Sequence, residues 1–169
     1  REELRDELPK LFSGRNAIVF YATTEPHEAL LFGNQTLTMH EGRITQFGPT
    51  AEIYRKPNSL VSARVFSDPP INIAKVTKKG RSLQLAHGDV TWPVAPSAAR
   101  LPDGDYSIGL QPHYVLPQKA SETSGALSGR VLVTEISGSE SVVHIDVGGQ
   151  TWVSQSHGVH PHQVGEMAT

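Results

Sequence analysis

The stretch that decides the fold runs from Ala17 to Pro49 and reads A-I-V-F-Y-A-T-T-E-P-H-E-A-L-L-F-G-N-Q-T-L-T-M-H-E-G-R-I-T-Q-F-G-P. Its first six residues, 17–22, are a short apolar run that predicts a buried strand. Thr24 is expected to cap the helix that follows, with Pro26 in the first turn, where the missing N–H of proline costs no hydrogen bond. The helix is expected to end at Gly33, because helices commonly close on a left-handed glycine.

The second half of the stretch predicts a hairpin. Strands are expected over residues 35–39 and 43–47, joined by a tight turn at Glu41-Gly42. The order is therefore strand, loop, helix and hairpin. In open α/β sheets, ligands bind beyond the carboxyl ends of the strands. Thr23 and Thr24 follow the first expected strand, so they are placed where a nucleotide would be expected.

Two motifs carry a resemblance to a known family. T-T-E-P-H-E-A at 23–29, followed after a helix and a strand by E-G-R-I-T-Q-F-G at 41–48, resembles the last part of an ABC-transporter ATPase domain. The closest likeness is to the ATPase subunits of maltose-type importers. G-P-T-A-E-I-Y-R-K-P-N-S-L at 48–60 resembles the segment at the exit of that domain, and an expected helix over 51–55 falls within it. An amphipathic helix is also expected over Arg1–Phe12, and its spacing fits the helix that precedes the switch strand in that family.

The resemblance places Thr24 where the family has a switch histidine that contacts the γ-phosphate of ATP. Thr24 is therefore the candidate catalytic residue. A threonine hydroxyl can donate one hydrogen bond, but it cannot carry a proton or a charge near neutral pH as imidazole can. His27 lies three residues later and is not expected to replace that histidine. The alternative for Thr24 is a plain helix cap, and the sequence leaves both interpretations open.

The texture of the chain changes after a double-proline passage, Phe66–Asn72. The boundary is expected near Val65, giving a C-terminal piece of a nucleotide-binding domain at 1–65 and a second domain at 66–169. Helical periodicity then disappears, and short strands alternate with glycine-containing turns, which predicts a small all-β barrel. The expected strands are 73–76, 82–85, 90–94, 106–110, 129–136, 141–147 and 151–154. The overall fold class is thus an α/β fragment, the end of an ABC ATPase domain, followed by an OB-like β-barrel.

The β region carries a weaker resemblance to the transport-associated OB-like domain of the same family. Residues 106–114 are similar to its (S/T)-x-G-(I/V)-R-P-E-H motif, and residues 129–140 to a G-x-V-x-x-x-E-x-x-G-x-E segment. Three residues depart from the first motif, since Gln111 replaces arginine, His113 replaces glutamate and Tyr114 replaces histidine. A regulatory salt bridge made there in relatives is therefore not expected here.

Several motifs of an active ATPase are missing from this sequence. It has no G-x-x-x-x-G-K-(S/T) phosphate loop and no L-S-G-G-Q signature. The phosphate loop matters because its backbone N–H groups and its lysine neutralise the triphosphate. The chain looks like a fragment, so ATP and magnesium are expected to belong to the complete subunit, and this chain is expected to be inactive by itself. The histidines in S-H-G-V-H-P-H at 156–162 are expected to be exposed in a loop rather than to bind a metal, because the nearest acid, Glu166, is expected in a loop as well.

Composition restricts the remaining classes. The 169 residues carry a net charge of −2 and no cysteine, so neither a basic nucleic-acid surface nor a disulfide framework is expected. The resemblance implies the ATP-binding subunit of an importer for sugars or polyols, at the cytoplasmic face of the inner membrane. Its partners would be a second ATPase subunit and the permease subunits. The β-domain would serve subunit pairing or regulation.

Two alternatives remain. The β-domain could be a separate OB-type module that binds an oxyanion, a sugar or an oligonucleotide; the aromatic side chains available for stacking are Trp92, Trp152, Tyr106 and Tyr114. The first 65 residues could also be too few for a self-sufficient core. In that case a dimer with exchanged segments would be expected.

Overall fold

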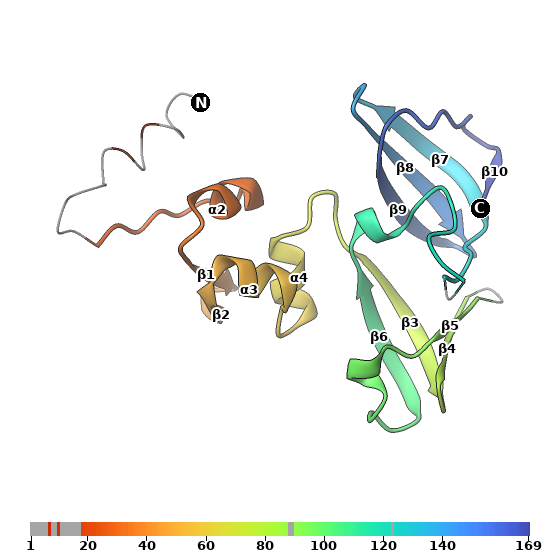
Figure 1. Ribbon diagram of the computed structural model, residues 1–169, viewed down its shortest axis with the longest axis horizontal. Helices are drawn as coiled ribbons and strands as arrows, with labels where there is room; N and C mark the ends of the chain where they lie inside the picture. Colours follow the sequence, from red (N-terminus) through yellow and green to blue (C-terminus); the bar gives the residue numbers. More distant parts are fainter. Residues whose placement is uncertain (1–6, 8–9, 11–17, 88–89, 123) are drawn as a thin grey trace. The chain divides into compact units, whose positions relative to one another are not determined.

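The computed structural model describes residues 7, 10, 18–87, 90–122 and 124–169. The chain divides into two compact units, Arg1–Asp68 and Pro69–Thr169 (Figure 1). The division lies close to the boundary expected at Val65, and the assignment of each unit to a functional domain stays a prediction. The helix expected at Arg1–Phe12 lies outside the described residues, apart from residues 7 and 10.

The described residues of the first unit form short helices and one hairpin. Its elements are α2 (Pro26–Phe32), β1 (Gln35–His40), β2 (Arg43–Pro49), α3 (Thr50–Arg55) and α4 (Leu60–Val65). An α/β ATPase core is not evident among the described residues of this unit, whose only paired strands are β1 and β2. The order of helix, hairpin and short helix is the one that the sequence predicts.

The prediction of a strand at residues 17–22 is wrong for residues 18–22, which the structure describes. Residues 18–22 form no strand, and the side chains of Ile18 and Phe20 are 88% and 92% exposed. A strand needs a neighbour to receive its backbone N–H and C=O groups. Within the described residues no strand pairs with this run, so apolar composition alone does not make it a strand.

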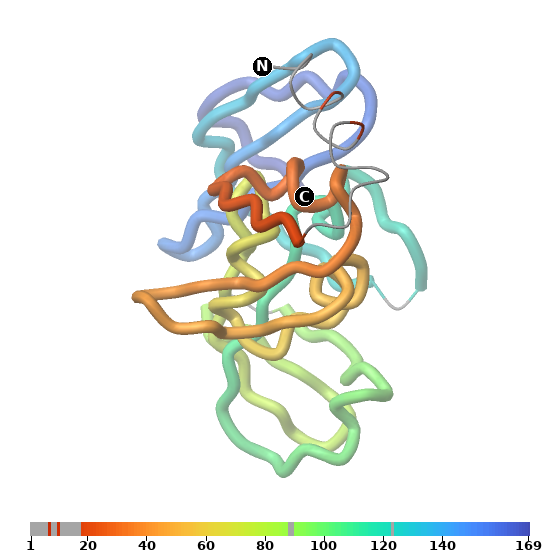
Figure 2. Tube along the Cα trace, turned by 90° about the vertical axis from the view of Figure 1, so that its left-hand side faces the viewer, coloured from red at the N-terminus to blue at the C-terminus, as the bar shows by residue number. Residues whose placement is uncertain are grey.

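The β1–β2 hairpin confirms the second half of the opening stretch. Its antiparallel register pairs Leu37 with Phe47 and ends at His40↔Arg43. At the turn, Glu41 has φ 47° and Gly42 has φ 73°, and two successive left-handed residues give a turn whose twist suits the flanking strands. Figure 2 shows the two long arms of this hairpin joined by the tight turn.

Helices α3 and α4 follow the hairpin. Helix α3 agrees with the expected 51–55 and begins one residue earlier, whereas α4 has no counterpart among the expected elements. Ser59 caps α4, because its side-chain oxygen accepts a hydrogen bond from the backbone N–H of Ser62 at 3.2 Å. Ile53 and Phe66 are buried in the small core of this unit.

In the second unit, the residues that the structure describes form two four-stranded antiparallel sheets. One has the order β5-β4-β3-β6 and the other β10-β7-β8-β9. The bounds are β3 (Asn72–Lys79), β4 (Ser82–Leu85), β5 (Thr91–Pro93), β6 (Gly104–Leu110), β7 (Gly129–Ile136), β8 (Glu140–Val147), β9 (Gln150–His157) and β10 (Met167–Ala168), with short 3₁₀ turns η1 (Pro96–Ala98) and η2 (Pro112–Tyr114). The coarse prediction of a β-rich unit after Ile71 is confirmed, and the arrangement is compatible with a barrel-like domain.

Each of the seven expected strands has a counterpart. Strands β4 and β7 have the expected bounds, whereas β3, β6, β8 and β9 extend beyond them and β5 is shorter. The sequence missed β10, which pairs with β7 through Met167↔Arg130. A strand of two residues is too short to show an alternating pattern, so β10 could not be predicted from the sequence.

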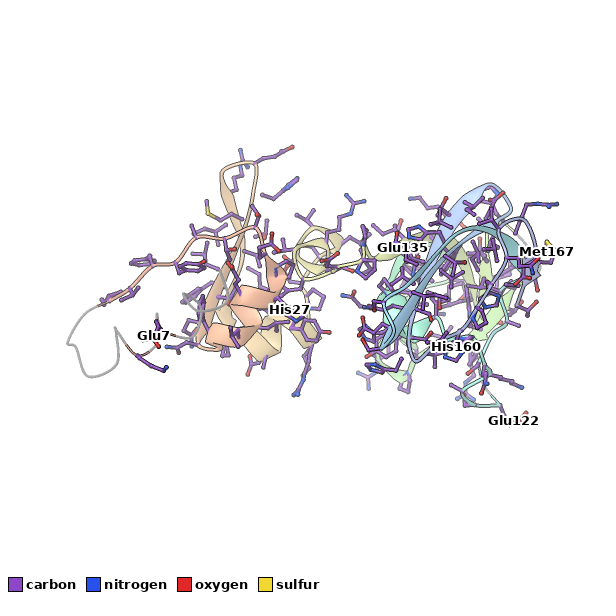
Figure 3. All side chains as sticks on the ribbon, turned by 90° about the horizontal axis from the view of Figure 1, so that it is seen from above. Glu7, His27, Glu122, Glu135, His160 and Met167 are labelled. Atoms are coloured by element: carbon purple, nitrogen blue, oxygen red, sulfur yellow. The ribbon has the colours of Figure 1, made fainter. Side chains whose placement is uncertain are left out.

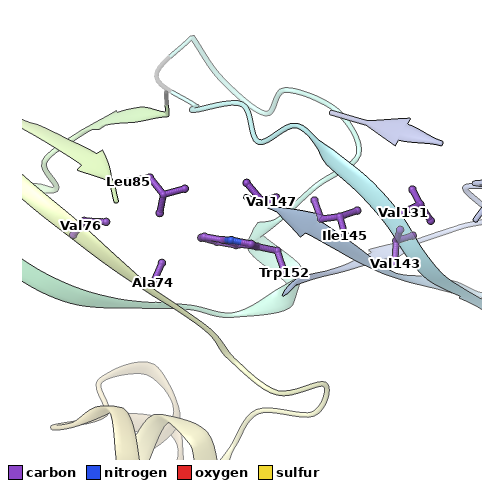
Figure 4. Packing of buried hydrophobic residues seen from close by; sticks show 8 residues of the cluster. All are labelled: Ala74, Val76, Leu85, Val131, Val143, Ile145, Val147 and Trp152. Carbon is purple, nitrogen blue, oxygen red and sulfur yellow. The ribbon is translucent and has the colours of Figure 1, made fainter. Parts of the chain in front are cut away.

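Both sheets contribute to one hydrophobic core (Figure 4). Alternate residues of β3 and β8 point inward, as the two-residue period of a strand requires. The buried members are Ala74, Val76, Leu85, Val131, Val143, Ile145, Val147 and Trp152. Trp152 is completely buried, and burying a large apolar side chain contributes about 1.5–3 kcal/mol.

Candidate functional site

The site predicted from sequence lies at the start of α2. The helix begins at Pro26, and its N-cap is Glu25, which makes no side-chain capping bond. The expectation that Thr24 caps the helix is therefore wrong. A residue before proline is held out of the helical region, which moves the helix start one residue beyond the expected cap. The Thr24 side chain is exposed, and its hydroxyl makes no hydrogen bond to any residue that the structure describes.

The neighbouring Thr23 makes the local hydrogen bonds instead. Its Oγ1 accepts a hydrogen bond from the backbone N–H of Glu25 at 2.9 Å, which is a threonine turn that spans Thr24. The same hydroxyl donates to Oε2 of Glu28 at 2.5 Å. Thr24 thus lies in the chain between Thr23 and Glu25, which the first of these hydrogen bonds joins.

Glu28 is the buried acceptor of this arrangement, with only 8% of the residue exposed. Its Oε2 also accepts a hydrogen bond from the phenol of Tyr21 at 2.9 Å. The ring of Tyr21 packs edge-to-face on Phe32, with 5.0 Å between the ring centroids. Helix α2 therefore holds the preceding segment through one carboxylate and one aromatic pair.

Sequence reasoning placed Thr23 beside Thr24 at the expected site without assigning its contacts, and it missed Glu28 and Tyr21. A signal for Glu28 was present, because a glutamate at the third helical position often reaches back over the helix start. The partners of that carboxylate could not be read from this signal. They depend on the path of the chain between Tyr21 and α2, for which the sequence has no spacing rule.

His27 lies on α2, where Figure 3 labels it, and its side chain is exposed. It contributes to none of the hydrogen bonds between Tyr21, Thr23 and Glu28. Whether Thr24 occupies a switch position at a nucleotide stays a prediction.

The segment that departs from the family motif forms η2 and the residues beside it. The backbone N–H of Tyr114 donates to the carbonyl of Gln111 at 3.0 Å, and Pro112 is buried. The rings of His113 and Tyr114 are in contact, with 4.3 Å between their centroids. Ser154 of β9 donates to the carbonyl of Val115 at 2.5 Å, so this turn is attached to the second sheet.

Of the three histidines expected in an exposed loop, His157 is instead the last residue of β9, and His160 and His162 are only partly exposed in the loop that follows. His160 Nε2 lies 3.0 Å from the carbonyl of His157, and His162 Nδ1 lies 2.7 Å from Glu166 Oε1. Glu166 lies in the loop just before β10, and its backbone carbonyl accepts a hydrogen bond from the N–H of Val131. Over the residues that the structure covers, no group of three or more metal-ligating side chains converges.

The aromatic surface suggested for an OB-type binder is not formed by Trp152, which is completely buried in the core. Trp92 packs against that core, and the phenol of Tyr106 donates to the carbonyl of Pro102 at 2.8 Å. Tyr114 is exposed. Trp152 therefore cannot stack on a base, because its ring is inaccessible.

Within the described part of the chain, no helix has the length and apolar character needed to span a membrane.

Comparisons with known proteins find relatives among import ATP-binding proteins, although no family model matches the chain. The chain is 26% identical over 160 residues to the sn-glycerol-3-phosphate import ATP-binding protein UgpC of Yersinia enterocolitica, a match that covers 92% of this chain and 44% of the relative. It is 28% identical over 153 residues to the maltose/maltodextrin import ATP-binding protein MalK of Yersinia pestis, covering 87% and 41%. It is 28% identical over 149 residues to UgpC 3 of Rhizobium johnstonii, covering 88% and 40%.

These matches confirm the resemblance drawn from the motifs. The three relatives named above are import ATP-binding proteins, two for sn-glycerol-3-phosphate and one for maltose and maltodextrin. The chain spans about two fifths of the length of these curated relatives, 44% of the first and 41% of the second.

Proposed function

We propose that this chain forms the C-terminal part of the ATP-binding subunit of an ABC importer for sugars or polyols. In this proposal residues 1–65 are the end of the nucleotide-binding domain, and residues 66–169 are the transport-associated regulatory domain. The homology to import ATP-binding proteins supports the class. The order of a threonine-bearing segment, α2, the β1–β2 hairpin and α3 agrees with the motifs that suggested it.

The observation that carries the proposal at the residue level is the free hydroxyl of Thr24. Among the described residues it is neither a helix cap nor a hydrogen-bond partner, so it is available to donate one hydrogen bond to a phosphate oxygen. Such a donor, already in position, stabilises developing negative charge without reorganisation during the reaction. Unlike a histidine, it cannot relay a proton near neutral pH.

ATP and magnesium would be bound by the complete subunit, because this sequence has neither a phosphate loop nor the signature motif. The subunit would pair with a second ATPase subunit and with permease subunits at the cytoplasmic face of the inner membrane. The β-rich second unit would serve pairing or regulation. One of the two nucleotide sites of the assembled pair would be weak, because Thr24 stands in place of the switch histidine.

The coding sequence upstream of Arg1 tests the class. A phosphate loop and an L-S-G-G-Q signature in the same reading frame would support the proposal. An in-frame stop codon closely followed by an initiator codon just before Arg1 would contradict it.

A variant of the complete subunit tests the role of Thr24. We expect Thr24→His to raise the rate of ATP turnover, because imidazole supplies the missing proton-carrying group. His27→Ala is the matched control, since this exposed histidine lies on α2 and outside the hydrogen bonds around Thr23, and its rate should be unchanged. No gain in the Thr24→His subunit would argue against a switch position at Thr24.

A further inference from the structure

We propose that Glu28 is a positioning residue that holds Thr24 in place for the phosphate, without touching the phosphate itself. The inference rests on the proposed function, in which Thr24 faces the terminal phosphate of ATP. Glu28 belongs to α2, so it connects the loop that carries Thr24 to the helix that follows. None of the motifs that identify the family assigns it this role.

The geometry gives the reason. Two hydroxyl groups donate to the same carboxylate oxygen, that of Tyr21 at 2.9 Å and that of Thr23 at 2.5 Å. The Thr23 hydroxyl in turn accepts the N–H of Glu25 at 2.9 Å. Thr24 lies between Thr23 and Glu25, so its backbone is held on both sides by hydrogen bonds that connect Glu25 through Thr23 to Glu28.

The burial of Glu28 adds to the argument. Glutamate is almost never buried without partners, because desolvating a carboxylate is costly. Only 8% of Glu28 is exposed, and its carboxylate accepts hydrogen bonds from Tyr21 and Thr23, which both belong to the segment before α2. A carboxylate that only stabilised the helix start could remain in solvent, as Glu52 does in the first turn of α3.

The consequence is preorganisation. A hydroxyl that is held before the nucleotide arrives loses little entropy when it binds, and a small displacement of such a group lowers a reaction rate strongly. Removing the Glu28 acceptor leaves the hydroxyls of Tyr21 and Thr23 without this partner. The segment around Thr24 is then released, although Thr24 itself is unchanged.

The first experiment uses this chain alone and needs no nucleotide. Hydrogen exchange of the Glu25 backbone amide, followed by NMR, reports the bond to Thr23. We expect Glu28→Ala to raise the exchange rate roughly tenfold, the effect of losing one hydrogen bond to a charged group. Glu28→Gln retains an acceptor oxygen and should recover part of the protection, whereas Glu52→Ala, the matched change in α3, should leave the rate unchanged. An unchanged rate in Glu28→Ala would overturn the proposal.

The second experiment measures ATP turnover by the complete subunit. We expect Glu28→Ala to lower kcat roughly tenfold with little change in KM, and Glu28→Gln to restore most of it. Combining Glu28→Ala with Thr24→Ala should lower kcat no further than Thr24→Ala does, because both act through one hydroxyl.

The outcomes separate the two hypotheses. If Thr24→Ala leaves turnover intact, the proposed role of Thr24 fails, and with it the role of Glu28 in catalysis, even when the amide exchange behaves as expected. If Thr24→Ala lowers kcat and Glu28→Ala does not, the proposed function stands and the positioning role is overturned.

Discussion

Asn72 and Val153 are joined by two reciprocal hydrogen bonds that connect the two sheets of the second unit. The side-chain Nδ2 of Asn72 donates to the carbonyl of Val153 at 2.8 Å, and the Val153 N–H donates to Oδ1 at 2.6 Å. Both bonds are buried, and Asn72 is the first residue of β3 while Val153 lies in β9. The amide side chain thus imitates the backbone of a neighbouring strand.

The first prediction concerns this pair. We expect Asn72→Leu, which keeps the approximate size of the side chain, to lower the free energy of unfolding by roughly 2–4 kcal/mol, because two buried backbone groups of Val153 lose their partners. Urea denaturation followed by circular dichroism measures this change. Gln84→Leu, an exposed change in β4, is the control and should alter stability by less than about 0.5 kcal/mol. Equal stability of the two variants would contradict a connecting role for Asn72.

The second prediction concerns the pH dependence of stability through Asp103. The Lys78 ammonium donates to Oδ1 of Asp103 at 2.8 Å, and the Gly80 N–H donates to the same carboxylate at 2.9 Å. The hydrogen bond from Lys78, with help from Gly80, holds the pKa of Asp103 below its usual value. A carboxyl group whose pKa is lower in the folded state stabilises the fold above its unfolded pKa, and this contribution is lost as the pH falls through the folded pKa.

We therefore expect Asp103→Asn to be less stable than the original chain at pH 7, and the difference to shrink as the pH falls below about 4. The midpoints of urea denaturation of both proteins, measured at roughly every pH unit between about pH 2 and pH 7, would show this decrease in the stability difference. Asp105→Asn is the matched control, because Asp105 accepts a hydrogen bond from Thr77 rather than from a lysine. A difference that stays constant down to pH 2 would show that the pKa shift of Asp103 is not its cause.

The third prediction concerns the cap of α4. The Ser59 hydroxyl accepts the Ser62 N–H, so Ser59→Ala should destabilise the first unit by about 0.5–2 kcal/mol. Ser59→Asp keeps an acceptor at the cap and should retain most of the stability. Hydrogen exchange of the amides in 60–65 provides a local measurement, and equal protection in Ser59→Ala and the original chain would count against the cap.

Much of the local structure could be predicted from sequence where the determinants are close together in the chain. The Glu41-Gly42 turn and the helix end at Gly33 depend on left-handed backbone conformations, which a few residue types signal. The sequence also predicts the bounds of strands β4 and β7 as the structure has them. Turn residues and alternating patterns carry this information within a few positions.

The rest depends on partners that are distant in sequence or too short to form a pattern. Residues 18–22 have the composition of a strand, yet a strand also needs a neighbouring strand. Composition likewise cannot tell an exposed aromatic side chain from a buried one, so the sequence offers Trp152 as a stacking surface although its ring is buried. At the candidate site, the role of Thr24 stays a prediction, and the capping bond expected of it is wrong. The hydrogen bonds at the helix start are made by Thr23 and Glu28 instead.

The last prediction concerns Trp152 and the alternative of an OB-type binder. The chain contains two tryptophans, so Trp92→Phe leaves Trp152 as the sole indole. Because Trp152 has no exposed surface, we expect its fluorescence to be blue-shifted and resistant to quenching by iodide. Addition of single-stranded oligonucleotides should leave this emission unchanged, whereas a stacking platform would be quenched by the bases.

Trp152→Ala should cost about 3–5 kcal/mol of stability, as truncation of a buried aromatic side chain does. Quenching of Trp152 by iodide, or a loss well under 1 kcal/mol on truncation, would contradict its place in the core.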